Sequence, residues 1–120
     1  MLAGGSLGRV GTVARGLPVI LPVNYVALDR TILFFTRRGG DLETATATGN
    51  VAFEIDGTDI VYHEGWSVLV IGRCVHVADP VELDQVRVSR LSSWAGRDQD
   101  LLVRISVDEI SGRRIRHHGP

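Results

Sequence analysis

The residues of this chain whose types and spacing can support chemistry lie in one short stretch, Thr36-Arg37-Arg38-Gly39-Gly40. Two guanidiniums, a hydroxyl and two glycines follow a β-forming run and precede a helix-like segment from Leu42. Arginines, backbone amides made accessible by glycine, and a helix N-terminus are the groups that hold an anion in proteins. A solvated turn with two surface arginines has the same composition, and on spacing alone it is the commoner outcome. The stretch therefore leaves two alternatives open, an anion site and a solvated turn.

The rest of the chain offers few catalytic side chains. The single cysteine, Cys74, lies within an apolar run and is predicted to fill the core. His63 and His76 have no carboxylate at a motif spacing, and His76, late in a predicted strand, is expected to be a satisfied or edge histidine. The sequence contains no metal-ligand spacing, P-loop or nucleophile elbow. If the protein is an enzyme, a cofactor should carry the chemistry while the protein orients it.

The composition is that of an ordinary globular protein. The chain has 120 residues, the length of a single domain, with ends expected to be flexible at residues 1–6 and 117–120. All 13 basic residues are arginine, and with 14 acidic residues the net charge of −1 gives no general attraction to nucleic acid or to an anionic membrane. The single cysteine excludes an internal disulfide and indicates a reducing compartment. No signal peptide is evident, so we expect a cytoplasmic protein.

A series of predicted strands positions the candidate loop. Apolar and β-branched runs, some of which alternate with polar residues, predict strands over residues 8–15, 18–28, 31–36, 51–56, 66–78 and 101–111, with a hairpin turn at Asp29-Arg30. Short helices are expected over 41–48 and 83–91, a loop over 57–65, and a fraying basic tail from residue 112. Six strands joined mostly by short turns predict a mainly β protein, a six-stranded barrel with two or three short helices.

Pro22 and Asn24 lie inside the predicted strand 18–28. Proline cannot donate to a ladder, so Pro22 indicates an edge, a bulge or a place where pairing breaks. A broken ladder exposes backbone groups to a ligand. Asn24 is a weak strand former with a versatile polar head, and it either contacts a ligand or bonds its own backbone at a bulge.

Four segments in register resemble a known family. They are Leu21-Pro-Val-Asn-Tyr25, Phe34-Phe-Thr-Arg-Arg-Gly39, Gly65-Trp-Ser-Val-Leu-Val-Ile-Gly72 and the segment Leu102 to Arg113. Together they resemble the pyridoxamine 5′-phosphate oxidase-like family, the FMN-binding split β-barrel group, especially its short actinobacterial members. The similarity runs over about residues 7–116, and no single motif carries it alone.

The resemblance implies a homodimer with two FMN sites at the dimer interface. It implies that Pro22, Val23 and Asn24 line the isoalloxazine ring. Ser67 on the long strand and Trp94 from the loop before the last strand would complete the pocket, with Trp94 able to come from the partner subunit. Hydride would pass between the flavin and a reduced nicotinamide or another small-molecule substrate.

The resemblance also implies that Thr36 and the loop after it, with Arg37, Arg38 and Leu42, receive the ribityl phosphate. The family commonly reads Phe-Arg-Thr-x-x-Gly-Thr-Lys-Leu across this loop. This chain departs from that pattern at two positions, with Phe35 where the family has its first arginine and Asp41 where it has its lysine.

The change at Asp41 bears on phosphate binding. Asp41 is placed to be the N-cap of the helix from Leu42, where its carboxylate accepts the amides that a phosphate would use. Arg37 and Arg38 can offset that negative charge through charge-assisted bonds. The sequence leaves open whether Asp41 or the two arginines prevail, and weak flavin binding is one outcome consistent with it.

Several functions remain open at this stage. The leading one is an FMN-dependent oxidoreductase of unknown substrate. The first alternative is a non-enzymatic split-barrel binding protein with a degenerate phosphate loop, and the second is a deazaflavin-dependent reductase. True pyridoxamine 5′-phosphate oxidase activity is less expected, because the chain is short and lacks the phosphate arginine and lysine.

Overall fold

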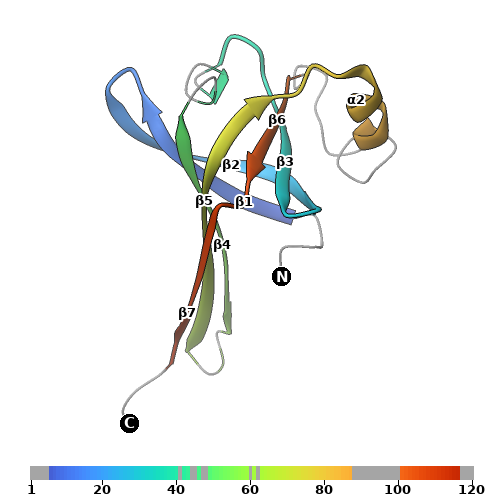
Figure 1. Ribbon diagram of the computed structural model, residues 1–120. Coiled ribbons are helices and arrows are strands. Elements are labelled where there is room, and N and C mark those ends of the chain that lie inside the picture. The colour runs from blue at the N-terminus through green and yellow to red at the C-terminus, as the bar shows by residue number, and fades with distance from the viewer. Residues whose placement is uncertain are drawn as a thin grey trace.

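The computed structural model describes residues 6–40, 42–43, 46, 49–59, 61, 63–87 and 101–116. These residues form a seven-stranded sheet and one helix, which are labelled as in Figure 1. The elements are β1 (Ser6–Ala14), β2 (Leu17–Leu28), β3 (Thr31–Thr36), β4 (Asn50–Asp59), β5 (Glu64–His76), α2 (Pro80–Arg87), β6 (Leu101–Ser106) and β7 (Glu109–Ile115).

Six of the strands close into an antiparallel barrel. Their order is β4-β1-β2-β3-β6-β5, and β5 pairs back to β4. Two-residue turns join β1 to β2 and β2 to β3, and all four turn residues, Arg15-Gly16 and Asp29-Arg30, have positive φ. Such turns match the twist of the strands they join, which fixes the register of both hairpins. The predicted mainly β six-stranded barrel is thus confirmed, with one strand added.

The added strand, β7, belongs to an arm that projects from the barrel (Figure 1). The early part of β5 pairs with β4 on one side and with β7 on the other, from Gly65↔Ile115 to Ile71↔Glu109. The late part of β5 pairs with β6, from Cys74↔Ile105 to His76↔Val103. The strands β6 and β7 therefore follow one another along the same edge of β5.

The change from β6 to β7 takes place beside Gly72. A Cβ on Gly72 would lie 1.6 Å from the carbonyl oxygen of Ser106. The backbone groups around this junction are paired, because the Asp108 N–H donates to Ile71 O at 3.1 Å and the Arg73 N–H donates to Ser106 Oγ at 3.2 Å. Only glycine permits so close an approach of two backbones.

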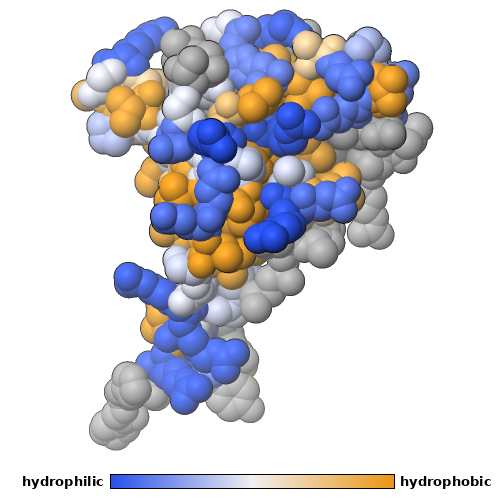
Figure 2. Space-filling model, in the orientation of Figure 1, coloured by the Kyte–Doolittle hydropathy of each residue, from blue (hydrophilic) through white to orange (hydrophobic). Residues whose placement is uncertain are grey.

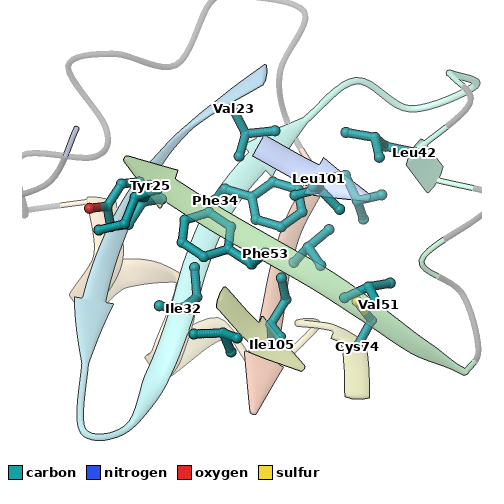
Figure 3. Packing of buried hydrophobic residues seen from close by; sticks show 14 residues of the cluster. Val23, Tyr25, Ile32, Phe34, Leu42, Val51, Phe53, Cys74, Leu101 and Ile105 are labelled. Carbon is teal, nitrogen blue, oxygen red and sulfur yellow. The ribbon is translucent and has the colours of Figure 1, made fainter. Parts of the chain in front are cut away.

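Two apolar clusters stabilise the barrel. The larger fills its interior, where the rings of Tyr25 and Phe53 meet edge to face with centroids 4.9 Å apart (Figure 3). Cys74 lies buried in this cluster, as the sequence predicted. Burial raises the pKa of its thiol to about 11. The smaller cluster consists of Leu33, Phe35, Val77 and Leu102, with Leu83 of α2 packed against it.

Several predicted boundaries were wrong. The single strand predicted over 101–111 is two strands, because the chain changes course at Val107-Asp108. The loop predicted over 57–65 is largely strand, and the expected fraying tail from residue 112 is paired up to Ile115. The second helix begins at Pro80 instead of residue 83. Of the first predicted helix, only Leu42, Glu43 and Thr46 lie within the described residues.

No helix among the described residues is both long and apolar enough to span a membrane.

We expect Gly72→Ala to destabilise the fold severely, because a methyl group would push the Ser106 carbonyl away from β5. The free energy of unfolding should fall by at least about 3 kcal/mol, measured by urea unfolding. Gly11→Ala is the matched control, since its Cβ would lie an ordinary 3.7 Å from the Ala52 side chain. Equal stability of the two variants would contradict this account of the junction.

Candidate functional site

The strands β2 and β3 part beside the candidate loop. Their pairing runs from Leu28↔Thr31 to Tyr25↔Phe34 and goes no further among the described residues. Beyond it, β2 continues against β1 and β3 continues against β6. The edge of β2 around Asn24 and the edge of β3 around Thr36 therefore face each other without pairing. This opening lies next to Pro22, where the sequence indicated that pairing could break.

The predicted ring-binding residues take different positions along β2. Val23 is buried in the barrel core, whereas Pro22 is exposed and Asn24 is half-buried on the outer surface. Thr36 is buried at the end of β3, close to the opening. The structure therefore brings the predicted ring strand and the start of the predicted phosphate loop to the same place.

Two other predicted residues have packing roles. The Phe35 side chain belongs to the small outer cluster against α2, and Leu42 belongs to the main core. Each is less than one-tenth exposed. These side chains hold the two ends of the loop in place.

The loop itself satisfies its glycine amides internally. Gly40 donates its N–H to Arg37 O at 3.3 Å, and Gly39, at φ 80°, donates its N–H to Glu43 Oε2. A carboxylate therefore already occupies an amide that a phosphate would use. The sequence reasoning assigned this effect to Asp41, which lies outside the described residues, and missed Glu43. An acidic residue in the first helical turn was the available signal. Arg37 and Arg38 are both exposed.

The end of β5 anchors the segment after the loop. Thr46 is fully buried, and its hydroxyl donates to Leu42 O at 2.5 Å. The same Oγ1 lies 2.9 Å from His76 Nε2, so it accepts the Nε2–H of the histidine. His76 is therefore a satisfied histidine, as expected, and it ties β5 to the chain that follows the candidate loop.

Ser67 lies apart from the rest of the predicted site. It sits in the arm, where its Cα partners are Asp56 of β4 and Arg113 of β7. Nine residues of β5, or about 30 Å of strand, separate it from His76. Around the barrel, β1 and β4 separate it from Asn24 of β2. Trp94 lies outside the described residues, so its predicted place in the pocket stays a prediction.

The outer face of β2, β1, β4 and β5 carries both polar site candidates and exposed apolar side chains. Cross-strand pairing places Asn24 opposite Leu7, and Ser67 opposite Asp56, so these side chains share one face. Leu7, Ile20 and Leu69 are 56%, 72% and 39% exposed. Figure 2 shows hydrophobic residues gathered where the arm joins the barrel, above a largely hydrophilic arm.

An ion-pair cluster crosses the same face. Arg9, the Cα partner of Pro22, donates to Glu54 Oε1 at 2.9 Å and to Asp56 Oδ2 at 2.5 Å. The hydrogen bond from Arg9 lowers the pKa of Asp56 below its usual value. The cluster fastens β1 to β4 at the level where their pairing ends.

Comparisons with known proteins agree with this architecture. The chain is 34% identical to the FAD binding protein of Mycobacterium smegmatis, whose structure superposes with a TM-score of 0.81 over 97% of this chain and 90% of that one. A protein of unknown function from Corynebacterium diphtheriae is 28% identical, with a TM-score of 0.74 over 97% of this chain and 89% of that one. Uncharacterized protein Rv0080 of Mycobacterium tuberculosis is 32% identical over 96% of this chain and 78% of its own length.

The barrel is closed by the pairing of β5 with β4, and β2 and β3 part beside a loop of arginines and glycines. This architecture is that of a split β-barrel protein. The pyridoxamine 5′-phosphate oxidase family model matches residues 1–114. The chain belongs to this family, and its structural neighbours include flavin-binding proteins. The resemblance identified from the four sequence segments is confirmed.

We expect Asp56→Asn to reduce the acid sensitivity of the fold. A carboxylate with a depressed pKa stabilises the protein above its unfolded pKa of about 3.9, and that contribution is lost as the pH falls through the lower folded pKa. Because the pair is partly exposed, the loss at pH 7 should be only about 0.5 kcal/mol. Urea unfolding at pH 7 and pH 2.5 measures it, with Asp84→Asn on α2 as control. An equal loss at both pH values would contradict the assignment.

Proposed function

We propose that this chain is a homodimeric flavin-binding oxidoreductase of the pyridoxamine 5′-phosphate oxidase-like family, with FMN as the expected cofactor. The observation that supports it most is the opening between β2 and β3 beyond Tyr25↔Phe34, which leaves strand edges available beside Pro22. The family membership and the flavin-binding neighbour support the same proposal.

The residues beside the opening fit a flavin ring. An isoalloxazine needs apolar contact for its faces and hydrogen-bonding groups for its pyrimidine edge. Pro22 offers an exposed apolar ring, and the peptide groups from Pro22 to Asn24 lie on a strand edge that β3 does not pair. The Asn24 side chain adds a donor and an acceptor on the outer face. When bound, the flavin would supply hydride transfer, while these groups would orient it.

The loop fits the phosphate less well than the strand fits the ring. Both glycine amides are already paired, one of them to the Glu43 carboxylate, so the guanidiniums of Arg37 and Arg38 would have to hold the phosphate. A terminal phosphate monoester brings about two negative charges close to Glu43. This arrangement favours a second candidate cofactor, FAD, in which each phosphate of the pyrophosphate carries one negative charge and whose adenosine adds contact area. The FAD binding protein of M. smegmatis supports this candidate.

The outer face supports the homodimer part of this proposal. Within one chain, Ser67 lies level with Asn24 but three strands away across β4 and β1, roughly 15 Å, so it does not contact a group held directly against Asn24. Ser67 and Asn24 share the outer face that exposes Leu7, Ile20 and Leu69. Association of two copies through this face would bury the apolar side chains and bring the partner's Ser67 to the site.

We expect Leu69→Glu to weaken the dimer, because it places a charge among the apolar side chains of the proposed interface. Analytical ultracentrifugation should show dimer for the wild type and mainly monomer for the variant. Val81→Glu, at an exposed apolar position on α2, is the matched control and should stay dimeric. A monomeric wild type, or loss of dimer in both variants, would rule out this interface.

We expect Glu43→Gln to bind FMN about five-fold more tightly or better, because it removes a negative charge beside the proposed phosphate position. Quenching of flavin fluorescence during titration measures the affinity, and the gain should be smaller for FAD. Glu64→Gln in the arm is the matched control and should bind like the wild type.

The same titration decides between the alternatives. If the wild type binds neither flavin, the flavoprotein proposal is wrong, and a deazaflavin is then the next cofactor to test. If it binds flavin but no nicotinamide reduces the complex, nicotinamides are ruled out as donors and the binding-protein alternative gains support.

A further inference from the structure

A second recess lies on the outer surface where β5 passes β6. It has a volume of about 410 Å³ and is lined by Gly49, Arg73, Cys74, Val75, Arg104 and Ser106. Its walls are the paired ends of two strands, since Val75 and Arg104 are Cα partners. Along β5, Arg73 lies six residues from Ser67, roughly 20 Å of strand. None of the lining residues of the recess is among the residues proposed to hold the flavin.

The charged lining of this recess consists of two arginines. Arg73 and Arg104 are diagonal neighbours across the two strands, a separation at which their side chains reach the same ligand. Two guanidiniums side by side repel each other unless anions lie between or around them. Carboxylates outside the recess can relieve this repulsion, while the lining itself, among the described residues, carries positive charge and no negative charge.

Each arginine has a carboxylate partner outside the recess. Arg104 Nη1 donates to Glu82 Oε1 of α2 at 2.6 Å, and Arg73 Nε lies 3.6 Å from Asp108 Oδ2. Neither carboxylate belongs to the lining. A guanidinium carries five N–H donors, and each of these ion pairs engages one nitrogen. The carboxylates therefore hold the arginines in position without filling the space between them.

The remaining walls set the size and character of a ligand. Val75, 47% exposed, gives one apolar surface. The Ser106 hydroxyl is fixed by the Arg73 backbone N–H at 3.2 Å and keeps the two strands in register at the base. The volume suits a small molecule.

We propose that this recess binds the oxyanion of a small molecule, a phosphate or a carboxylate group, between Arg73 and Arg104. The two guanidiniums hold the anion by charge-assisted hydrogen bonds, and Val75 contacts the body of the molecule. Arg104 also ties β6 to α2 through Glu82, so it has a structural role besides binding. Arg73, whose side chain is 76% exposed, has no such packing role and gives the clean test.

The test titrates the full chain with inorganic phosphate and, separately, with sodium acetate, at constant ionic strength. Amide chemical shifts of Gly49, Val75 and Ser106 report on the recess. We expect saturable shifts with at least one of the two anions, and the anion that saturates identifies the group recognised. Arg73→Gln should weaken that binding about five- to ten-fold, the effect of losing one charged hydrogen bond.

Arg116→Gln is the matched control. Arg116 is exposed and follows Ile115, which is the Cα partner of Gly65 in β5. Gly65 lies eight residues before Arg73, or about 26 Å along β5, so Arg116 is far from the recess. This variant should bind the anion like the wild type. Absence of saturable shifts with both anions, or equal affinities for the two variants, would overturn the proposal. Because the shifts are read in the absence of flavin, the outcome is independent of the cofactor proposal.

Discussion

The fold depends on one close approach, that of the Ser106 carbonyl to Gly72. Because Gly72 has no side chain, β6 ends against β5, and the chain passes through Val107 and Asp108 to continue as β7 along the same edge. The strand β5 thereby has three partners. Its late part closes the barrel and its early part builds the arm, so a single backbone contact couples the closed part of the sheet to the open part.

This arrangement leaves ligand binding to the outside of the barrel. A small barrel fills its interior with side chains, and here Tyr25, Phe34 and Phe53 are at most 1% exposed. What remains is the outer face and the places where strands part. The arm prolongs the outer face beyond the barrel, and Ser67 lies on this face three strands from Asn24. In the proposed dimer, the partner subunit would supply the second of these residues to one flavin site, so the arm that the Gly72 junction makes possible is also part of the proposed interface.

Local signals predicted much of this structure. Runs of apolar and β-branched residues on both sides of Asp29-Arg30 predicted the β2–β3 hairpin, and Pro22 indicated the break beside the site. The division of the last strand left no such signal, because no proline or glycine stands at Val107-Asp108 and the reason for the break lies in Gly72, more than thirty residues earlier. The position of Ser67 relative to Asn24 left no local signal either, since only the sheet order shows it, and its role in a flavin pocket stays a prediction. Glu43 was missed because its partner, the Gly39 amide, becomes defined only when the turn is folded.

The carboxylate of Glu43 changes what the loop can contribute to binding. A loop whose glycine amides point at water gains hydrogen bonds when a phosphate arrives, whereas this loop has already made them. A phosphate must either displace the Glu43 carboxylate from the Gly39 amide or bind beside it. In the first case the loop contributes only the difference between the new hydrogen bond and the one that is lost, and in the second case the two negative charges repel each other. In the proposed flavin complex, affinity would then come chiefly from the ring against β2, from an adenosine where one is present, and from the second subunit of the proposed dimer. The loop from Thr36 to Gly40, which the sequence singled out as a candidate anion site, is thus mainly a turn whose glycine amides are paired within the chain. The strand opening beside Pro22 is the more important half of the proposed site.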